Sequence, residues 1–150
     1  MARAEQLEPV VRELLASQPL AVLATHGNAG PYASLVAFAA TDDLRQLLFA
    51  TTRATRKFAN LQADPRVAFL VDNRSNDAAD FRDAVAATIR GSAEEVGDAE
   101  REGLLALYLG KHPHLRDFVD SPTCAFLKVH VESYYVVTRF QEVMELHIRP

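Results

Sequence analysis

Apolar and polar positions divide the chain into an amphipathic first segment and a long series of shorter apolar runs. Over residues 3–17 the apolar positions recur every three to four residues, with Glu and Arg residues on the opposite face. The apolar positions are Leu7, Val10, Val11, Leu14 and Leu15. This period predicts an amphipathic α-helix. From Pro19 onward the period changes, because runs of strand length alternate with turn-forming residues.

The first predicted strands form a hairpin and a third strand beside it. Residues 19–25 (PLAVLAT) and 31–40 (PYASLVAFAA) are apolar runs, and HGNAGP between them is rich in turn formers. A turn at residues 41–43 leads to a third run at residues 44–51 (LRQLLFAT). Three strands joined by short connections predict an antiparallel meander.

A short helix and a fourth strand come next. Residues 55–63 place Phe58 and Leu61 on one face, and the following Asp64-Pro65 stops a helix. The fourth strand is predicted at residues 66–72 (RVAFLVD).

A polar segment at residues 73–83 (NRSNDAADFRD) has neither the helical nor the strand period, so we predict a long loop. Loops of this length in compact domains often carry function. The remaining predicted elements are a strand at 84–96 bent at Gly91, a helix at 98–109 capped by Asp98, a helical segment at 113–119, and strands at 124–131, 133–140 and 142–148. Strands that adjoin one another predict a mainly β, α+β fold: an antiparallel barrel of six to seven strands with peripheral helices, in one domain spanning residues 1–150.

Composition narrows the class of protein. The chain has 150 residues, of which 49% are hydrophobic and 24% are charged, as in a single soluble globular domain. Its net charge of -4 argues against general nucleic-acid binding. No apolar run is long enough to span a membrane, and the amino-terminal segment lacks the apolar core of a signal peptide, which predicts a cytoplasmic protein without a membrane partner.

Several common chemistries find no support in the sequence. It contains no GxSxG, Walker-type or GxGxxG pattern, so we expect neither a hydrolase nor a nucleotide-triphosphate enzyme. His112-Pro113-His114 lacks a neighbouring acid or cysteine to complete a ligand set, so we predict no metal site. The lone Cys124 excludes an intramolecular disulfide, and it lies in an apolar strand as a small core residue. Tyr134-Tyr135 is predicted to fill the core or an interface.

One segment, residues 51–57 (TTRATRK), concentrates hydroxyls and cations in this acidic chain. Thr51 ends a predicted strand, residues 52–54 turn the chain, and Thr55 lies where a helix begins whose first turn holds Arg56 and Lys57. Unpaired backbone N–H groups and the helix dipole bind anions there, and the two cations add charge, so the segment fits a phosphate. The alternative is a Thr55 helix cap followed by solvated cations, and these residues alone leave both interpretations open. Two cations in a first turn oppose the dipole, however, and a bound anion would resolve that conflict.

The order of elements from Leu20 to Val71 resembles the flavin-binding split-barrel superfamily, the relatives of pyridoxamine 5′-phosphate oxidase. The similarity rests on PYASLVAF, LLFATT, RATRKFANL and DPRVAFLVD in that order. It implies a split β-barrel that binds flavin mononucleotide (FMN). The residues that it implies for the FMN phosphate are Thr51, Thr55, Arg56 and Lys57, with Thr52 in the same hydroxyl-rich turn. It sets Ser34, Leu35 and Val36 beside the flavin ring.

The chain departs from that family in two places. Its carboxyl-terminal sequence TRFQEVMELHIRP lacks the Arg-x-His pattern with which the namesake oxidase binds its substrate, so that activity is not expected. The family's glutamine on the strand after the fourth has no clear counterpart in RDAVAATIRG, and Asn73 is our candidate for a ring contact instead.

The resemblance implies an FMN-binding oxidoreductase that passes electrons between a reduced nicotinamide or similar donor and a small acceptor. No side chain emerges as catalytic. The alternative is a haem-binding or non-catalytic flavin-binding member of the same barrel. We also expect a homodimer with FMN at the interface, in which residues 73–83 complete the partner's site. The apolar segments 124–131 and 133–140 are the expected source of the contact between subunits.

Overall fold

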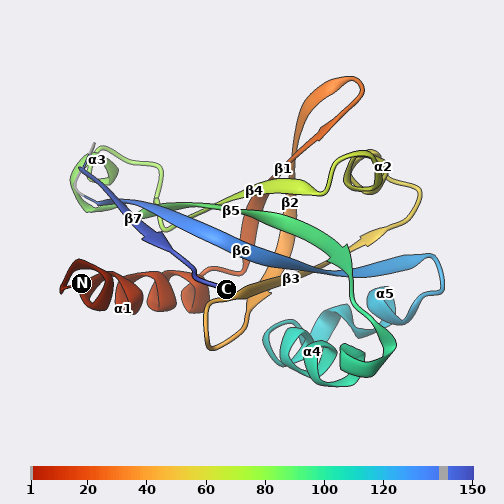
Figure 1. Cartoon of the computed structure of the whole chain (residues 1–150). Helices are drawn as coiled ribbons and strands as arrows, with labels where there is room; N and C mark the ends of the chain where they lie inside the picture. The colour runs from red at the N-terminus through yellow and green to blue at the C-terminus, as the bar shows by residue number, and fades with distance from the viewer. Residues whose placement is uncertain (1, 139–141) are drawn as a thin grey trace.

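The computed structural model describes residues 2–138 and 142–150, and within them one antiparallel sheet of seven strands forms most of the molecule (Figure 1). The strands are β1 Leu20–Gly27, β2 Gly30–Ala40, β3 Gln46–Thr52, β4 Arg66–Asp72, β5 Ala86–Glu95, β6 Cys124–Thr138 and β7 Glu142–His147. The helices are α1 Ala2–Ser17, α2 Arg56–Ala63, α3 Asp80–Asp83, α4 Asp98–Lys111 and α5 Arg116–Asp120, with a 3₁₀ turn at Pro113–Leu115.

Six of these strands close into a barrel. The sheet order is β3-β2-β1-β4-β5-β6-β7, and β3 also pairs with β6, from Gln46 opposite His130 to Thr52 opposite Cys124. β7 pairs with residues 133–138 of β6, past the part of β6 that pairs with β3, so it is not one of the six strands of the barrel. The predicted mainly β fold with an antiparallel barrel and peripheral helices is confirmed.

The barrel has one apolar core inside and a second on its outer surface. Inside, side chains such as Phe38, Phe49 and Phe69 pack together, and the buried face of α1 joins them as predicted, with Leu7, Val11, Leu14 and Leu15. Outside, α4 and α5 cover β3 and β6, where Tyr108 packs against Phe126 with 5.5 Å between ring centroids. Burial of large apolar surfaces of this kind is the main stabilising contribution to the fold.

The structure corrects three details of the predicted elements. Segments 124–131 and 133–140 are not two strands: residues 124–138 form the single strand β6, and the last two predicted residues lie outside the described residues. Asp98 is the first residue of α4 rather than its cap, which is Gly97. The segment 73–83 is not entirely a loop, since it contains the short helix α3.

The predicted bend at Gly91 is present as an irregularity in the pairing of β5 with β6. The register shifts between Arg90 and Gly91. A Cβ atom at position 91 would lie 2.2 Å from the backbone oxygen of His130, closer than any side chain tolerates. Glycine is therefore required where the two backbones approach each other.

Candidate functional site

The barrel opens between β2 and β3, beside the TTRATRK segment. Pairing of these strands ends at Phe38 opposite Phe49. Continuation of the same register would set Val36 opposite Thr51 and Leu35 opposite Thr52, but no such pairing occurs in the described sheet. In Figure 1 the β1–β2 hairpin points upward while β3 runs toward α2. The two groups of residues predicted to bind a cofactor therefore flank one split in the sheet.

Hydroxyl groups tie the end of β3 to the start of α2. The Thr55 hydroxyl donates to Thr52 O at 2.9 Å and accepts from Phe58 N at 3.2 Å, so Thr55 is the N-cap of α2. Because that hydroxyl has one proton, Thr51 is the donor in the 3.1 Å contact between Thr51 Oγ1 and Thr55 Oγ1. The cap that we gave as an alternative is present. The two hydroxyls therefore contribute acceptor oxygens and rigidity, and the donors for an anion come from the next residues.

The first turn of α2 has donors without acceptors. The backbone N–H groups of Arg56 and Lys57 have no protein acceptor within the described residues, because Thr55 caps only Phe58. The side chains of Arg56 and Lys57 form no ion pair within the same part of the chain. One turn thus carries four donor groups, two backbone N–H groups and two cationic side chains, and the acids that usually stabilise a helix start are missing there.

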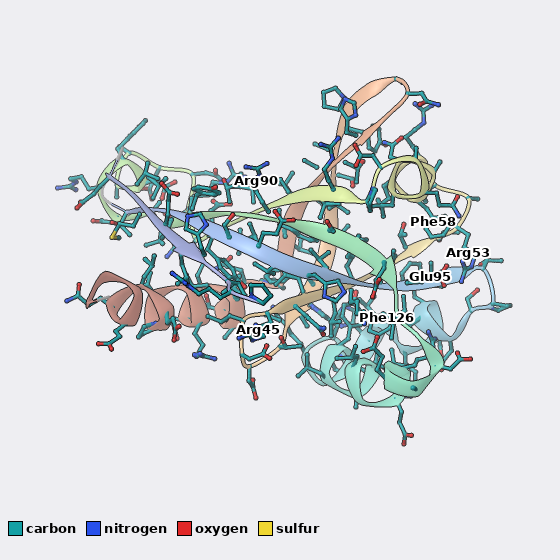
Figure 2. The ribbon with its side chains drawn as sticks, in the orientation of Figure 1. Arg45, Arg53, Phe58, Arg90, Glu95 and Phe126 are labelled. Carbon is teal, nitrogen blue, oxygen red and sulfur yellow. The ribbon has the colours of Figure 1, made fainter. Side chains whose placement is uncertain are left out.

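Arg53, the third cation of the segment, is already engaged. Its guanidinium makes a bidentate ion pair with Glu95, at 2.6 and 2.8 Å, and lies over the Phe58 ring (Figure 2). The hydrogen bonds with Glu95 raise the pKa of Arg53 and lower the pKa of Glu95. Arg53 therefore fixes the turn between β3 and α2 and is not available to a ligand in this arrangement.

Asn60 fixes the position of α2 on the barrel. Its side chain is buried and donates to Thr25 Oγ1 of β1 at 3.1 Å. A Cβ atom at Gly27 would lie 2.0 Å from Asn60 Oδ1, so a residue larger than glycine would displace the Asn60 side chain from this position. Sequence reasoning missed Asn60, Thr25 and Gly27. Asn60 is two residues from Phe58, so the helical period places it away from the face that Phe58 and Leu61 share, and the sequence carried no signal of its burial.

On the other side of the split, Ser34 presents a buried hydroxyl without a partner. Ser34 Oγ is inaccessible to solvent and has no hydrogen-bond partner within the described residues. Val36, two positions further on, is buried, whereas Leu35 points to the opposite face and is 66% exposed. A buried polar atom without a partner is unfavourable unless a ligand or water satisfies it, so Ser34 fits a position beside a polar group of a ligand.

Asn73 lies far from this split within one chain. The pairs β4–β1, β1–β2 and β2–β3 are each antiparallel, so β4 and β3 run in opposite directions. Asn73 directly follows the end of β4, and it therefore lies at the opposite end of the barrel from Thr52, the last residue of β3. Figure 1 shows the same separation, with α3 on the left and α2 on the right. Asn73 Oδ1 accepts from Val85 N at 2.7 Å, which closes the segment that contains α3. Contact between Asn73 and a ligand in the split requires a second subunit.

Two buried side chains, Tyr108 of α4 and His112 directly after it, hold β2 next to the split. Tyr108 donates to Ala37 O at 3.0 Å, and His112 Nε2 donates to Phe38 O at 2.7 Å. Burial raises the pKa of Tyr108, which keeps its phenol protonated as a donor. Burial also lowers the pKa of His112, so the neutral imidazole is the favoured form. His112 thus has a structural contact, and the described residues contain no group of three or more side chains able to hold a metal ion.

Comparison with known proteins identifies the family. A family model described as pyridoxamine 5′-phosphate oxidase matches residues 7–138. The chain belongs to this family. The match covers all six strands of the barrel, and therefore both sides of the split. A comparison with the sequences of curated proteins gives no match.

Solved structures similar to this pyridoxamine 5′-phosphate oxidase family member agree on the fold. The heme binding protein from Mycobacterium smegmatis superposes with a TM-score of 0.83 at 19% identity, covering 93% of this chain and 57% of that chain. The General Stress Protein 26 from Bacillus anthracis str. Sterne has a TM-score of 0.70 at 18% identity, covering 95% and 99%. An FAD-binding protein from Mesorhizobium loti has a TM-score of 0.65 at 18% identity, covering 83% and 88%. The barrel is thus shared by proteins described as binding different cofactors.

Among the described residues, none of the helices combines the length and the apolar character needed to cross a bilayer.

Proposed function

We propose that the protein binds FMN at the split between β2 and β3, with the phosphate at the first turn of α2. The observation that carries this proposal is the set of donors at that turn: two backbone N–H groups and two cationic side chains, those of Arg56 and Lys57, without acceptors in the described residues. A phosphate accepts hydrogen bonds from all four and matches the positive end of the helix dipole. Membership of the pyridoxamine 5′-phosphate oxidase family supports the same cofactor class.

The surrounding residues have distinct parts in this proposal. Thr51, Thr52 and Thr55 fix the turn that presents the donors, through the hydroxyl contacts between β3 and α2. Ser34 offers its hydroxyl to the flavin ring, and the edge of β2 at Leu35 and Val36, which is not paired with β3, offers it backbone groups. Bound FMN supplies the transfer of a hydride or of single electrons, and the protein supplies position and control of solvent. We propose an oxidoreductase role on this basis, with a reduced nicotinamide or similar donor and a small acceptor.

The proposal includes a homodimer in which the partner completes each flavin site. An exposed apolar strip runs over the outer face of β1, β2 and β4, in which Leu35 is 66% and Leu20 is 51% exposed. Exposed apolar surface next to a ligand site is typical of an interface. In this arrangement Asn73 and residues 74–83 approach the partner's flavin. The surface differs from the one that we expected from sequence, because β6 is paired along both edges and buried.

Haem is the second candidate cofactor, since one similar structure is described as a heme binding protein. Haem contains no phosphate, and its only anionic groups are two propionate carboxylates, so a phosphate-sized set of donors at Arg56 and Lys57 favours FMN over haem. The absorbance spectrum of the purified protein tests the choice. Two flavin bands support FMN, a single intense Soret band supports haem, and a protein that takes up neither cofactor on reconstitution contradicts both.

A comparison of FMN with riboflavin, which lacks the phosphate, tests where the phosphate binds. We expect FMN to bind at least about a hundredfold more tightly than riboflavin, since two or more charge-assisted hydrogen bonds contribute roughly 1.5 to 3 kcal/mol each. Equal affinity for FMN and riboflavin would contradict the assignment of the first turn of α2 to the phosphate.

A further inference from the structure

A cavity distant from the split combines two cations with apolar walls. It lies between the carboxyl-terminal half of α1, the turn that joins β2 to β3, and the end of α4, and its volume is about 180 Å³. The lining residues that bear on a ligand are Arg12, Leu15, Asp42, Leu44, Leu107 and Lys111. Because the turn from β2 to β3 is at the opposite end of β3 from Thr52, this cavity does not belong to the proposed flavin site.

Lys111 is held at the edge of this cavity without a carboxylate partner. Its ammonium donates to Leu15 O at 2.8 Å and lies 3.9 Å from the centroid of the Phe38 ring. It forms no ion pair within residues 2–138 and 142–150. An ammonium has three N–H donors, and these two contacts leave one for a ligand. Burial lowers the pKa of Lys111 to about 8, as expected of a cation that has lost water and gained no counter-ion.

Arg12 supplies a second cation on the same wall. Its guanidinium donates to the backbone oxygen of Asp42 and likewise has no carboxylate partner in the described residues. A guanidinium has five N–H donors, so one backbone contact leaves most of them available. Arg12 and Lys111 are the cations that line the cavity, Asp42 is its one acidic residue, and His112 follows Lys111 in sequence. Arg12 and a protonated Lys111 outnumber the one acid.

We propose that this cavity binds a small organic carboxylate, whose anionic group contacts Lys111 and Arg12 and whose short apolar part lies against Leu15, Leu44 and Leu107. A carboxylate supplies the counter-ion that the described residues do not provide to either cation. The apolar wall selects against inorganic anions. The volume is smaller than the roughly 300 to 1,000 Å³ of sites for drug-sized ligands, which limits the ligand to a short chain or a single ring.

Benzoate is a suitable probe, and benzamide is its neutral counterpart of the same shape. In amide NMR spectra of the full chain, we expect benzoate to shift signals of residues 12–16, 39–44 and 107–111, and benzamide to leave them unchanged. Lys111→Met should weaken benzoate at least about tenfold, Lys111→Arg should retain most of the affinity, and Arg116→Met, which removes an exposed cation elsewhere, should have no effect. Arg12→Met should also weaken benzoate, and it leaves the contact of Lys111 with Leu15 in place.

Proton linkage provides a second measurement. Benzoate stabilises the charged form of Lys111, so binding at a pH just above 8 should take up a proton, and its heat should depend on the ionisation enthalpy of the buffer. Proton uptake should disappear in Lys111→Met. Shifts at other residues only, equal binding of benzamide, or unchanged affinity in both Lys111→Met and Arg12→Met would each overturn the proposal. The outcome is independent of FMN, because benzoate is tested on flavin-free protein and at a different end of the barrel.

Discussion

Arg56 and Lys57 differ from Arg53 in what they contact, although all three cations lie in one short segment. Arg53 is paired with Glu95, whereas Arg56 and Lys57 have no carboxylate partner in the described residues. Replacement of Arg56 and Lys57 by Ala should weaken FMN by roughly a hundredfold or more and leave riboflavin nearly unchanged, because only FMN has the phosphate. Fluorescence titration with both flavins provides the measurement.

Arg53→Ala is the matched control for this experiment. It removes a cation from the same turn, but one whose charge is already neutralised by Glu95. We expect it to change FMN affinity by less than about tenfold, since exposed ion pairs contribute about 1 kcal/mol or less. An Arg53→Ala effect as large as that of the double replacement would mean that the whole segment acts by general electrostatic attraction.

We expect replacement of Ser34 to affect protein stability and FMN binding differently. Its buried hydroxyl has no partner in the described residues, so Ser34→Ala should leave the free energy of unfolding of flavin-free protein unchanged or raise it by up to about 1 kcal/mol. The same change should weaken FMN, because it removes a donor to the ring. Urea unfolding and flavin titration measure the two effects. Thr25→Val is the control, since it removes a buried hydroxyl that accepts from Asn60, and it should destabilise the protein.

At the scale of elements, the position of α2 depends on a close approach to β1. Gly27→Ala places a Cβ atom against Asn60 Oδ1, so it should be strongly destabilising when Asn60 is present. Asn60→Ala removes the clash. In that background, the loss of unfolding free energy caused by Gly27→Ala should be smaller by about 1 kcal/mol or more. A double-mutant cycle in urea measures this coupling. Strictly additive effects would show that α2 is not held by this contact.

The contact of α4 with β2 should make stability depend on pH. Burial lowers the pKa of His112 in the folded protein below its ordinary value of 6.5. As the pH falls below 6.5, the unfolded chain binds a proton that the folded protein resists, so stability present at pH 7 is lost toward acid. His112→Gln retains a side-chain donor but cannot titrate, and its unfolding free energy should change less between pH 7 and pH 5. An identical change in both proteins would assign the effect to other groups.

The order of the elements was predictable from the sequence, whereas their ends and their close contacts were not. Period and turn residues identified the barrel strands and α2, because apolar faces must be buried whatever their partners. The prediction of two strands in place of β6 was wrong. Polar residues at the centre of this segment, such as Glu132 and Ser133, suggested a turn, but they lie at the sheet irregularity opposite Gly91. The Thr55 cap and the Arg56-Lys57 turn were local in sequence and were found. Asn60 with Gly27, and Arg53 with Glu95, join distant residues and needed the fold.

At the scale of the whole molecule, the barrel leaves an apolar strip exposed beside the split. The strip follows the outward positions of β1 and of its neighbours β2 and β4, and includes Leu20, Val22, Leu35 and Leu70. We expect this face to form the homodimer interface, and the segment that begins at Asn73 to complete the flavin site of the partner. Flavin that binds only the dimer must stabilise the dimer by mass action.

Leu20→Glu tests the interface without altering a residue assigned to the flavin. A charge on this apolar face should shift the protein to monomers and weaken FMN, because each monomer has only part of the site. Phe118→Glu is the control, since Phe118 is 40% exposed but lies on α5, away from the strip. Sedimentation over a range of dilutions, with and without FMN, measures both effects. If the wild-type protein stays monomeric at micromolar concentration with FMN bound, each barrel holds its flavin alone, and the apolar strip needs a different explanation.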